Sequence, residues 1–136
     1  MGPVASFSLC LLVFLIFNPW LEGTWATSCP REWLHYEGHC YGVFPEKRTW
    51  SDAEVECQTH RLGAHLASIL SKAEGDTVAN YIITSGFRDN IWIGLRDSHQ
   101  NGRWKWTDGS LYHYSAWESK QPDNEYGVEY CAGLRI

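Results

Sequence analysis

Residues 91–109 read IWIGLRDSHQNGRWKWTDG, and this stretch decides the fold class. Its first five residues form an apolar run, which predicts a buried strand. Residues 104–106 alternate between tryptophan and lysine, which is typical of a strand with one exposed face, and Asp108-Gly109 is a turn signal. The stretch therefore places strands of a sheet in the second half of the chain.

Two helix-start signals precede these strands. Ser51-Asp52-Ala53-Glu54 has the Ser-x-x-Glu form of a capping box and predicts a helix to about His60. Ser71-Lys72-Ala73-Glu74 repeats the pattern and predicts a second helix to about Ile83. Helices followed by strands indicate an α+β domain.

Three shorter segments complete the expected fold. Cys29 and Cys40 bracket an aromatic segment that predicts an N-terminal hairpin. Residues 65–69 alternate weakly and predict a short strand. Residues 127–136, which contain Cys131, predict a further strand.

The N-terminus predicts export. Phe7 to Phe17 is an unbroken apolar run, shorter than the roughly 20 residues that span a bilayer. Thr24 and Ala26 place small side chains at a cleavage position. We therefore expect a signal peptide over residues 1–26 and a secreted domain over residues 27–136. A retained membrane anchor is the alternative, because no Lys or Arg precedes the run.

Cleavage after Ala26 removes Cys10 and leaves four cysteines. An even number in a small exported domain is typical of a disulfide framework, for which three pairings are open. The formal net charge of −5 disfavours nucleic-acid binding, which needs a basic surface. No membrane span is expected once the signal is removed.

The order of these motifs resembles the C-type lectin domain. The closest likeness is to compact secreted members, the regenerating proteins and the galactose-binding lectins of snake venoms. The resemblance covers essentially the whole chain after residue 26 and implies a C-type lectin-like fold of two helices, mixed and antiparallel strands and a long loop region. The motifs that carry it are Cys29, Cys40, residues 50–57, residues 65–69, residues 92–95, residues 104–109, Gln121-Pro122-Asp123 and Cys131.

The resemblance also implies a disulfide pattern. Cys29 would pair with Cys40, while Cys57 and Cys131 would each pair with a cysteine near the end of the domain. Those partners and the family's Trp-Asn-Asp motif do not occur before Ile136. The expectation is a domain truncated before its last strands, with Cys57 and Cys131 unpaired and with no lectin activity of its own.

Gln121, Asp123 and Glu129 provide the oxygen ligands that calcium prefers. In C-type lectins the proline at the position of Pro122 is cis, which aims both flanking side chains at one ion. The ion then binds two neighbouring sugar hydroxyls, and the same side chains hydrogen-bond those hydroxyls. The resemblance therefore implies Ca²⁺ as cofactor and a carbohydrate site made by Gln121, Asp123, Glu129 and the nearby Tyr126.

The Gln-Pro-Asp form implies a preference for galactose-type sugars. One departure concerns the aromatic residue that stacks on galactose in relatives, because Glu125 occupies that position and Tyr126 follows it. A second calcium site, found in some relatives, would consist of Asp97, Asn101, Asn124 and Glu129.

The expected partners are glycans or glycoconjugates, and self-association is left open. The alternative function is that of a calcium-independent, regenerating-type protein that acts by contact with protein, mineral or bacterial cell wall. Catalysis is not expected, because the sequence has no recognisable nucleophile elbow and the carboxylates near the site are accounted for by calcium.

Overall fold

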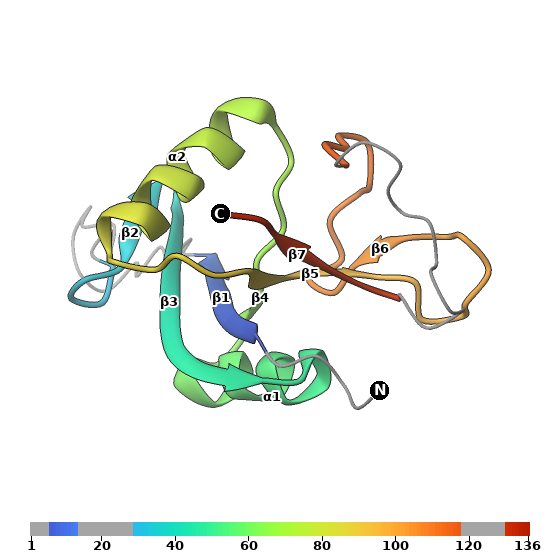
Figure 1. Cartoon of the computed structure of the whole chain (residues 1–136), viewed down its shortest axis with the longest axis horizontal. Coiled ribbons are helices and arrows are strands. Elements are labelled where there is room, and N and C mark those ends of the chain that lie inside the picture. The colour runs from blue at the N-terminus through green and yellow to red at the C-terminus, as the bar shows by residue number, and fades with distance from the viewer. Residues whose placement is uncertain (1–5, 14–28, 118–129) are drawn as a thin grey trace, which may run out of the picture.

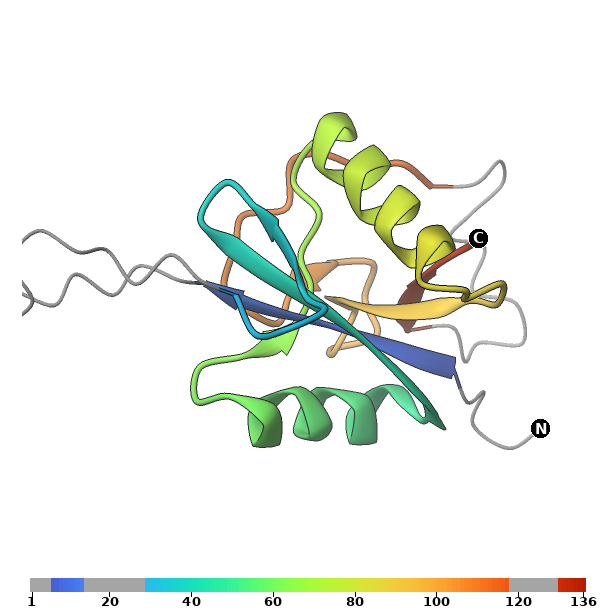
Figure 2. The same ribbon diagram turned by 90° about the vertical axis from the view of Figure 1, so that its left-hand side faces the viewer.

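The computed structural model describes residues 6–13, 29–117 and 130–136. Within these ranges the chain has the predicted α+β fold, a mixed sheet with one helix on either side (Figures 1 and 2). The elements are β1 (Ser6–Val13), β2 (Leu34–Tyr36), β3 (His39–Arg48), α1 (Trp50–His60), β4 (His65–Leu66), α2 (Lys72–Thr84), β5 (Ile91–Arg96), β6 (Lys105–Trp106) and β7 (Cys131–Leu134).

The strand order along the sheet is β2-β3-β1-β5-β6, with β4 paired to β1 and β7 paired to β5. β1 runs antiparallel to β3, with Cys10 opposite Gly42, and parallel to β5, with Phe7 opposite Ile91. Strands from the beginning, middle and end of the described chain therefore meet in one sheet.

β5 is the buried strand that the sequence predicts. Ile91, Ile93 and Leu95 are buried, and Trp92 is half-buried with its Nε1 donating to the carbonyl of Arg48 at 2.8 Å. The other buried apolar residues lie around it on both sides of the sheet. They are Leu9, Cys10, Leu11, Cys40, Tyr41, Trp50, Ala53, Cys57, Ala64, Leu66, Ala67, Ile69, Val78, Ile82, Trp106 and Ala132.

Gly94 marks the closest approach between β5 and the chain beside it. Its N–H donates to the carbonyl of Ala67 at 2.8 Å, and its carbonyl accepts from the N–H of Thr107 at 2.8 Å. A Cβ at this position would lie 2.5 Å from the carbonyl oxygen of Leu66 and 2.7 Å from Cγ2 of Thr107. Only glycine fits here, because a backbone atom cannot move aside as a flexible side chain can.

Both predicted helices form, and one of them begins earlier than predicted. Ser71 caps α2 as expected, since its hydroxyl accepts from the N–H of Glu74 at 3.1 Å. The cap of α1 is Thr49, whose hydroxyl accepts from the N–H of Asp52, and not Ser51. The backbone N–H groups of a first helical turn have no partner within the helix, and a threonine two residues before Ser51 can accept from them equally well. The helix therefore begins at Trp50.

The glutamates of the two predicted capping boxes have a different role in the fold. Glu54 is buried and accepts from the N–H of Leu66 at 3.0 Å, and it lies 2.6 Å from Nδ1 of His65. Glu74 is buried and accepts from the N–H of Leu70 and from the hydroxyl of Tyr41. Each carboxylate therefore attaches its helix to the strand or loop beside it.

Burial and the neighbouring Glu74 carboxylate raise the pKa of Tyr41 far above its usual range. Tyr41 itself is fully buried in β3. Its hydroxyl consequently remains a neutral donor to Glu74 at all physiological pH values.

Two disulfides staple the described residues. Cys29–Cys40 closes the N-terminal hairpin of β2 and β3, and this confirms the pairing implied by the family resemblance. Cys57, expected to be unpaired, is instead bonded to Cys10, so that expectation is wrong. In the structure of the whole chain Cys10 lies in β1, where its sulfur reaches that of Cys57 in α1. Cys131 is a free thiol, as expected. The expected cleavage site after Ala26 lies outside the described residues.

Gly75→Ala is expected to stabilise the fold. Gly75 lies in α2, and a Cβ there would meet only the side chain of Ile69 at 3.4 Å, an ordinary contact. Alanine in a helix is favoured over glycine by about 0.5–1 kcal/mol. Thermal unfolding followed by circular dichroism should show a midpoint several degrees higher, and a lower midpoint would contradict this account of α2.

Candidate functional site

Most of the residues predicted to bind calcium and sugar lie in one segment outside the described residues. These residues are Gln121, Asp123, Asn124, Tyr126 and Glu129. The structure does describe the residues on either side of that segment, and it describes Asp97 and Asn101. The geometry of these neighbours shows where the described chain stops before that segment and resumes after it.

Trp117 anchors the chain just before the segment. Its indole Nε1 donates to the hydroxyl of Tyr112 at 2.7 Å. Its ring packs edge-on against Trp104, with 4.9 Å between ring centroids and 61° between planes. Trp104 directly precedes β6, so this anchor fixes Trp117 beside the β5–β6 hairpin.

Tyr130 and Cys131 anchor the chain just after the segment. The carbonyl of Tyr130 accepts from the N–H of Asp97 at 2.9 Å, and Cys131 lies opposite Arg96 in the antiparallel pairing of β7 with β5. Trp117 and Tyr130, the described residues on either side of the segment, are therefore both attached to the β5–β6 hairpin, which is labelled in Figure 1.

Asp97 is buried, and both of its carboxylate oxygens accept from the backbone of the loop that follows it. Oδ1 accepts from the N–H of Asn101 at 3.1 Å, and Oδ2 accepts from the N–H of Gly102 at 2.6 Å. The amide oxygen of Asn101 in turn accepts from the N–H of Arg103 at 3.1 Å. Two of the four residues predicted for a second calcium site thus shape the β5–β6 loop.

No group of three or more His, Cys, Asp or Glu side chains that could hold a metal ion occurs among residues 6–13, 29–117 and 130–136. Both predicted calcium sites depend on residues between 118 and 129. Calcium binding therefore remains a prediction from the sequence.

A second network fixes the chain between β6 and Trp117. The hydroxyl of buried Ser68 donates to Asp108 at 2.5 Å, and the other oxygen of Asp108 accepts from the N–H of Ser110 at 2.9 Å. Gly109, between Asp108 and Ser110 in the sequence, has a φ of 85°, and this confirms the turn predicted at Asp108-Gly109. This turn starts the chain on its path toward Trp117.

A shallow groove lies beside the hairpin, and the sequence did not indicate it. The lining residues are Trp50, Glu54, Arg96, Ser98, Lys105, Trp106 and Thr107. The guanidinium carbon of Arg96 lies 4.9 Å from the ring centroid of Trp50 in a cation–π contact.

The free thiol of Cys131 lies opposite Arg96 in the pairing of β7 with β5. Burial raises the pKa of this thiol, so it is a poor nucleophile at neutral pH.

The contacts that join Trp117 to Tyr112 and Trp104 are what sequence reasoning missed. Residues 104–106 were predicted only as a strand with one exposed face, and Tyr112 was not singled out. The high density of aromatic residues between positions 104 and 117 was a signal, but it does not reveal which rings pair.

Tyr112→Phe is expected to weaken the galactose binding predicted from the sequence a few-fold while leaving the fold intact. The change removes the acceptor of the Trp117 indole but keeps the phenyl ring, so packing against Trp106 at 6.4 Å between centroids is preserved. A typical hydrogen bond contributes about 0.5–1.5 kcal/mol. Affinity on a galactose surface measures the effect. Tyr114→Phe, two residues along, is the matched control, and an equal loss there would argue against the anchor.

Comparison with known proteins agrees with this fold. A family model described as the lectin C-type domain matches residues 46–135. Human lithostathine superposes with a TM-score of 0.73 and 40% sequence identity, covering 79% of this chain and 81% of that chain.

The similar sequences include a regenerating protein and proteins named as C-type lectins. Regenerating islet-derived protein 4 of Homo sapiens is 46% identical over 109 residues, which cover 79% of this chain and 66% of that protein. The C-type lectin galactose-binding isoform of Hoplocephalus stephensii is 39% identical over 133 residues, covering 96% of this chain and 84% of the relative. The C-type lectin mannose-binding isoform of Notechis scutatus scutatus is 38% identical over 132 residues, with the same two coverages. This chain belongs to the C-type lectin domain family.

Proposed function

We propose that this protein is a calcium-dependent carbohydrate-binding lectin. The observation that carries the proposal is the Gln121-Pro122-Asp123 motif with Glu129, in a segment whose two ends are attached to one hairpin. Trp117 and Tyr130 fix those ends through contacts with Tyr112 and Asp97. Such anchoring favours a site in which several side chains act on one ion, since fewer conformations must be restricted on binding.

Calcium would be held by the amide oxygen of Gln121 and the carboxylates of Asp123 and Glu129. All three are hard oxygen donors, which match the ligand preference of this ion. When bound, the ion supplies open coordination positions for sugar hydroxyls. The side chains of this chain orient those hydroxyls, because a carboxylate accepts hydrogen bonds while the amide nitrogen of Gln121 donates one.

The proposed sugar class is galactose. Overall identity does not decide the class, because the relatives named galactose-binding and mannose-binding are 39% and 38% identical to this chain. The preference therefore rests on the Gln-Pro-Asp order, which places the amide before the proline and the carboxylate after it. Tyr126 is the proposed aromatic contact for the apolar face of the sugar.

Export is part of the proposed function. A lectin of this kind meets its glycans outside the cell, and disulfides form and persist in oxidising compartments. In the part of the chain that the structure describes, neither helix has the length and apolar character needed to cross a membrane. We assign the domain a binding role and no catalytic one.

A calcium-independent lectin-like protein is the second candidate function. It is favoured by the loop-shaping role of Asp97 and Asn101, whose oxygens already accept from backbone N–H groups. It is also consistent with the 46% identity to Regenerating islet-derived protein 4. Such a protein would use the same anchored segment for direct contact with a protein, mineral or cell-wall surface.

Chromatography distinguishes the two functions. The domain completed with the last strands and the Trp-Asn-Asp motif that the family resemblance implies, applied in calcium to matched galactose and mannose matrices, should be retained on galactose and released by a chelator. Retention that survives chelation would support the calcium-independent function. Retention on mannose alone would contradict the sugar assignment but not the calcium site.

A further inference from the structure

Asn101-Gly102 is an exposed pair in the loop between β5 and β6. The backbone nitrogen of a residue can attack the side-chain amide of a preceding asparagine, and a side chain on the attacking residue hinders this approach. Glycine has no side chain, and no other asparagine of the sequence precedes a glycine. Asn101 is therefore the asparagine whose sequence context most favours spontaneous modification.

The reaction open to this pair is formation of a succinimide ring. The Gly102 nitrogen bonds to Cγ of Asn101 while the bond from Cγ to Nδ2 breaks, and the displaced proton leaves with Nδ2 as ammonia. Water then adds to either carbonyl of the ring and opens it, which gives aspartate or isoaspartate at position 101. The new bond replaces the N–H bond, so Cγ must come to lie in the direction in which the Gly102 N–H points.

In the folded loop, Asp97 occupies that direction. Its Oδ2 accepts from the N–H of Gly102 at 2.6 Å, and its Oδ1 accepts from the N–H of Asn101 at 3.1 Å. Asp97 is only 4% exposed, so water does not readily replace its carboxylate. The carboxylate also disfavours loss of the Gly102 proton, because the nitrogen would become negatively charged beside an existing negative charge.

Further hydrogen bonds hold the loop around Asp97. The side-chain oxygen of Asn101 accepts from the N–H of Arg103 at 3.1 Å, and the carbonyl of Asp97 accepts from the N–H of Gln100 at 3.2 Å. Gln100 has a φ of 56°, a conformation that a residue other than glycine keeps only where its surroundings impose it. Ring formation therefore requires the loop to leave Asp97 first.

We infer that Asn101 is a modification site that Asp97 keeps unreactive in the folded protein. Opening of the β5–β6 loop frees the Gly102 nitrogen, and Asn101 then converts to aspartate or isoaspartate. This inference does not depend on calcium or sugar binding, since it concerns only the chemistry of residues 97–103.

The conversion has a structural consequence. Isoaspartate adds one carbon to the backbone between residues 101 and 102, and aspartate places a second carboxylate beside Asp97. Like charges repel, so the modified loop does not close on Asp97 as before. The N–H of Asp97 also donates to the carbonyl of Tyr130 at 2.9 Å, so the change acts on the residue that attaches the chain just before β7.

Peptide mapping of the full chain tests the inference. Folded and denatured protein are incubated in the same mildly alkaline buffer, with near-ultraviolet circular dichroism confirming each state. Trypsin cleaves after Arg96 and Arg103, and tandem mass spectrometry with isoaspartyl methyltransferase labelling measures conversion of Asn101 in the peptide released. Conversion should be slower in the folded chain by roughly tenfold or more, because a hydrogen bond to a charged group must break first. Equal rates in the two states would overturn the inference.

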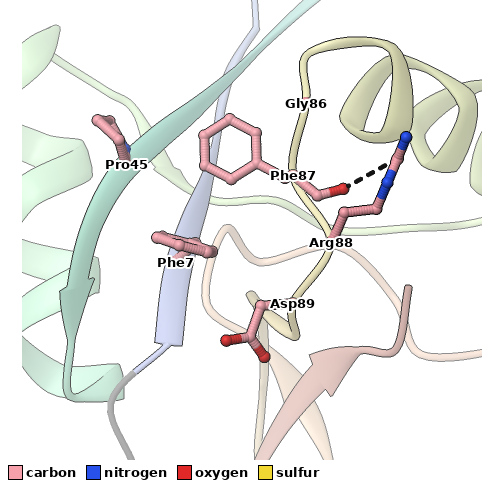
Figure 3. Close-up of a pocket in the computed structure, with 6 residues that line it drawn as sticks. All are labelled: Phe7, Pro45, Gly86, Phe87, Arg88 and Asp89. Carbon is pink, nitrogen blue, oxygen red and sulfur yellow. Dashed lines mark hydrogen bonds between the residues drawn. The ribbon is translucent and has the colours of Figure 1, made fainter.

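Asn90 is a comparison site within the same chain. It is exposed like Asn101, and it follows Asp89, which lines the shallow pocket of Figure 3 and pairs with Lys47 at 2.7 Å. The next residue is Ile91, whose branched side chain hinders attack by its nitrogen. Asn90 should therefore stay unmodified in both states, and conversion of Asn90 as fast as that of Asn101 would contradict the role of Gly102.

Asp97→Asn tests the protecting carboxylate. An amide has one acceptor oxygen, so it cannot accept from both N–H groups, and Asn101 should convert in the folded variant at close to the denatured rate. Asp76→Asn, on the exposed face of α2 where Asp76 pairs with Lys72, should convert like the parent. A natively folded Asp97→Asn protein with the parent's rate would overturn the inference.

Hydrogen exchange in the parent provides a second measurement, which is decisive if Asp97→Asn does not fold. The Gly102 N–H should exchange slowly, because Asp97 holds it. Fast exchange of this N–H in a folded chain would show that Asp97 does not protect it and would contradict the inference.

Discussion

Gly94→Ala is expected to prevent normal folding of the domain. The added Cβ would lie 2.5 Å from the carbonyl oxygen of Leu66, well inside van der Waals contact. Neither strand can move away, because Gly94 is hydrogen-bonded to Ala67 on one side and to Thr107 on the other. Overpacking typically costs about 1–3 kcal/mol, and this contact with a backbone atom belongs at the upper end of that range. A small domain is stable by only about 5–15 kcal/mol.

Thermal unfolding and recovery of soluble protein measure this effect. We expect a midpoint lower by roughly 10–20 °C or no folded product. Gly75→Ala is the matched control, since the same methyl group is added where space exists. Adding Thr107→Ser to Gly94→Ala removes the 2.7 Å contact but not the contact with the Leu66 carbonyl, so it should restore only part of the loss. A Gly94→Ala protein as stable as the parent would show that the packing of β5 against residues 66–67 is misplaced.

Asp123→Ala and Glu129→Ala are each expected to abolish retention on a galactose matrix. Under the proposed function each carboxylate binds the ion and also accepts a hydrogen bond from the sugar, so one substitution removes both interactions. Hydrogen bonds to charged groups contribute about 1.5–3 kcal/mol, and the lost ion contact adds to this. The expected loss of affinity is therefore ~100-fold or more.

Glu118→Ala is the control for these two variants. It removes a carboxylate from the same segment but outside the Gln-Pro-Asp and Glu129 positions. It should retain galactose binding and the thermal stability of the parent. Equal losses for Glu118→Ala and Asp123→Ala would mean that overall charge, and not a calcium site, governs retention.

Local patterns predicted the elements that depend on local interactions. The apolar run at Ile91 predicted β5, and the hydroxyl of Ser71 predicted the start of α2, because both signals act within a few residues. The start of α1 was misplaced because Thr49 and Ser51 offer equivalent hydroxyls, and only packing of Trp50 chooses between them. Fold class followed from these elements and was confirmed.

Contacts between residues far apart in the sequence could not be predicted from local patterns. The apolar run before residue 18 has the length of a signal core, and nothing in its composition shows that Cys10 can reach Cys57. The Trp117–Tyr112 anchor and the Asp97–Tyr130 hydrogen bond likewise depend on how the hairpin places its neighbours. The ligand set was identified by motif and spacing, and it stays a prediction because its residues lie between positions 118 and 129.

The central claim is that calcium and sugar share their protein ligands, and a linked titration tests it most directly. Two sites that share ligands must show reciprocal coupling of their affinities. Calorimetric titration of methyl galactoside into the domain completed with its last strands should give binding heat in calcium and none after chelation. Calcium titrated in saturating methyl galactoside should bind more tightly than calcium alone. Equal galactoside affinity with and without calcium would contradict the account.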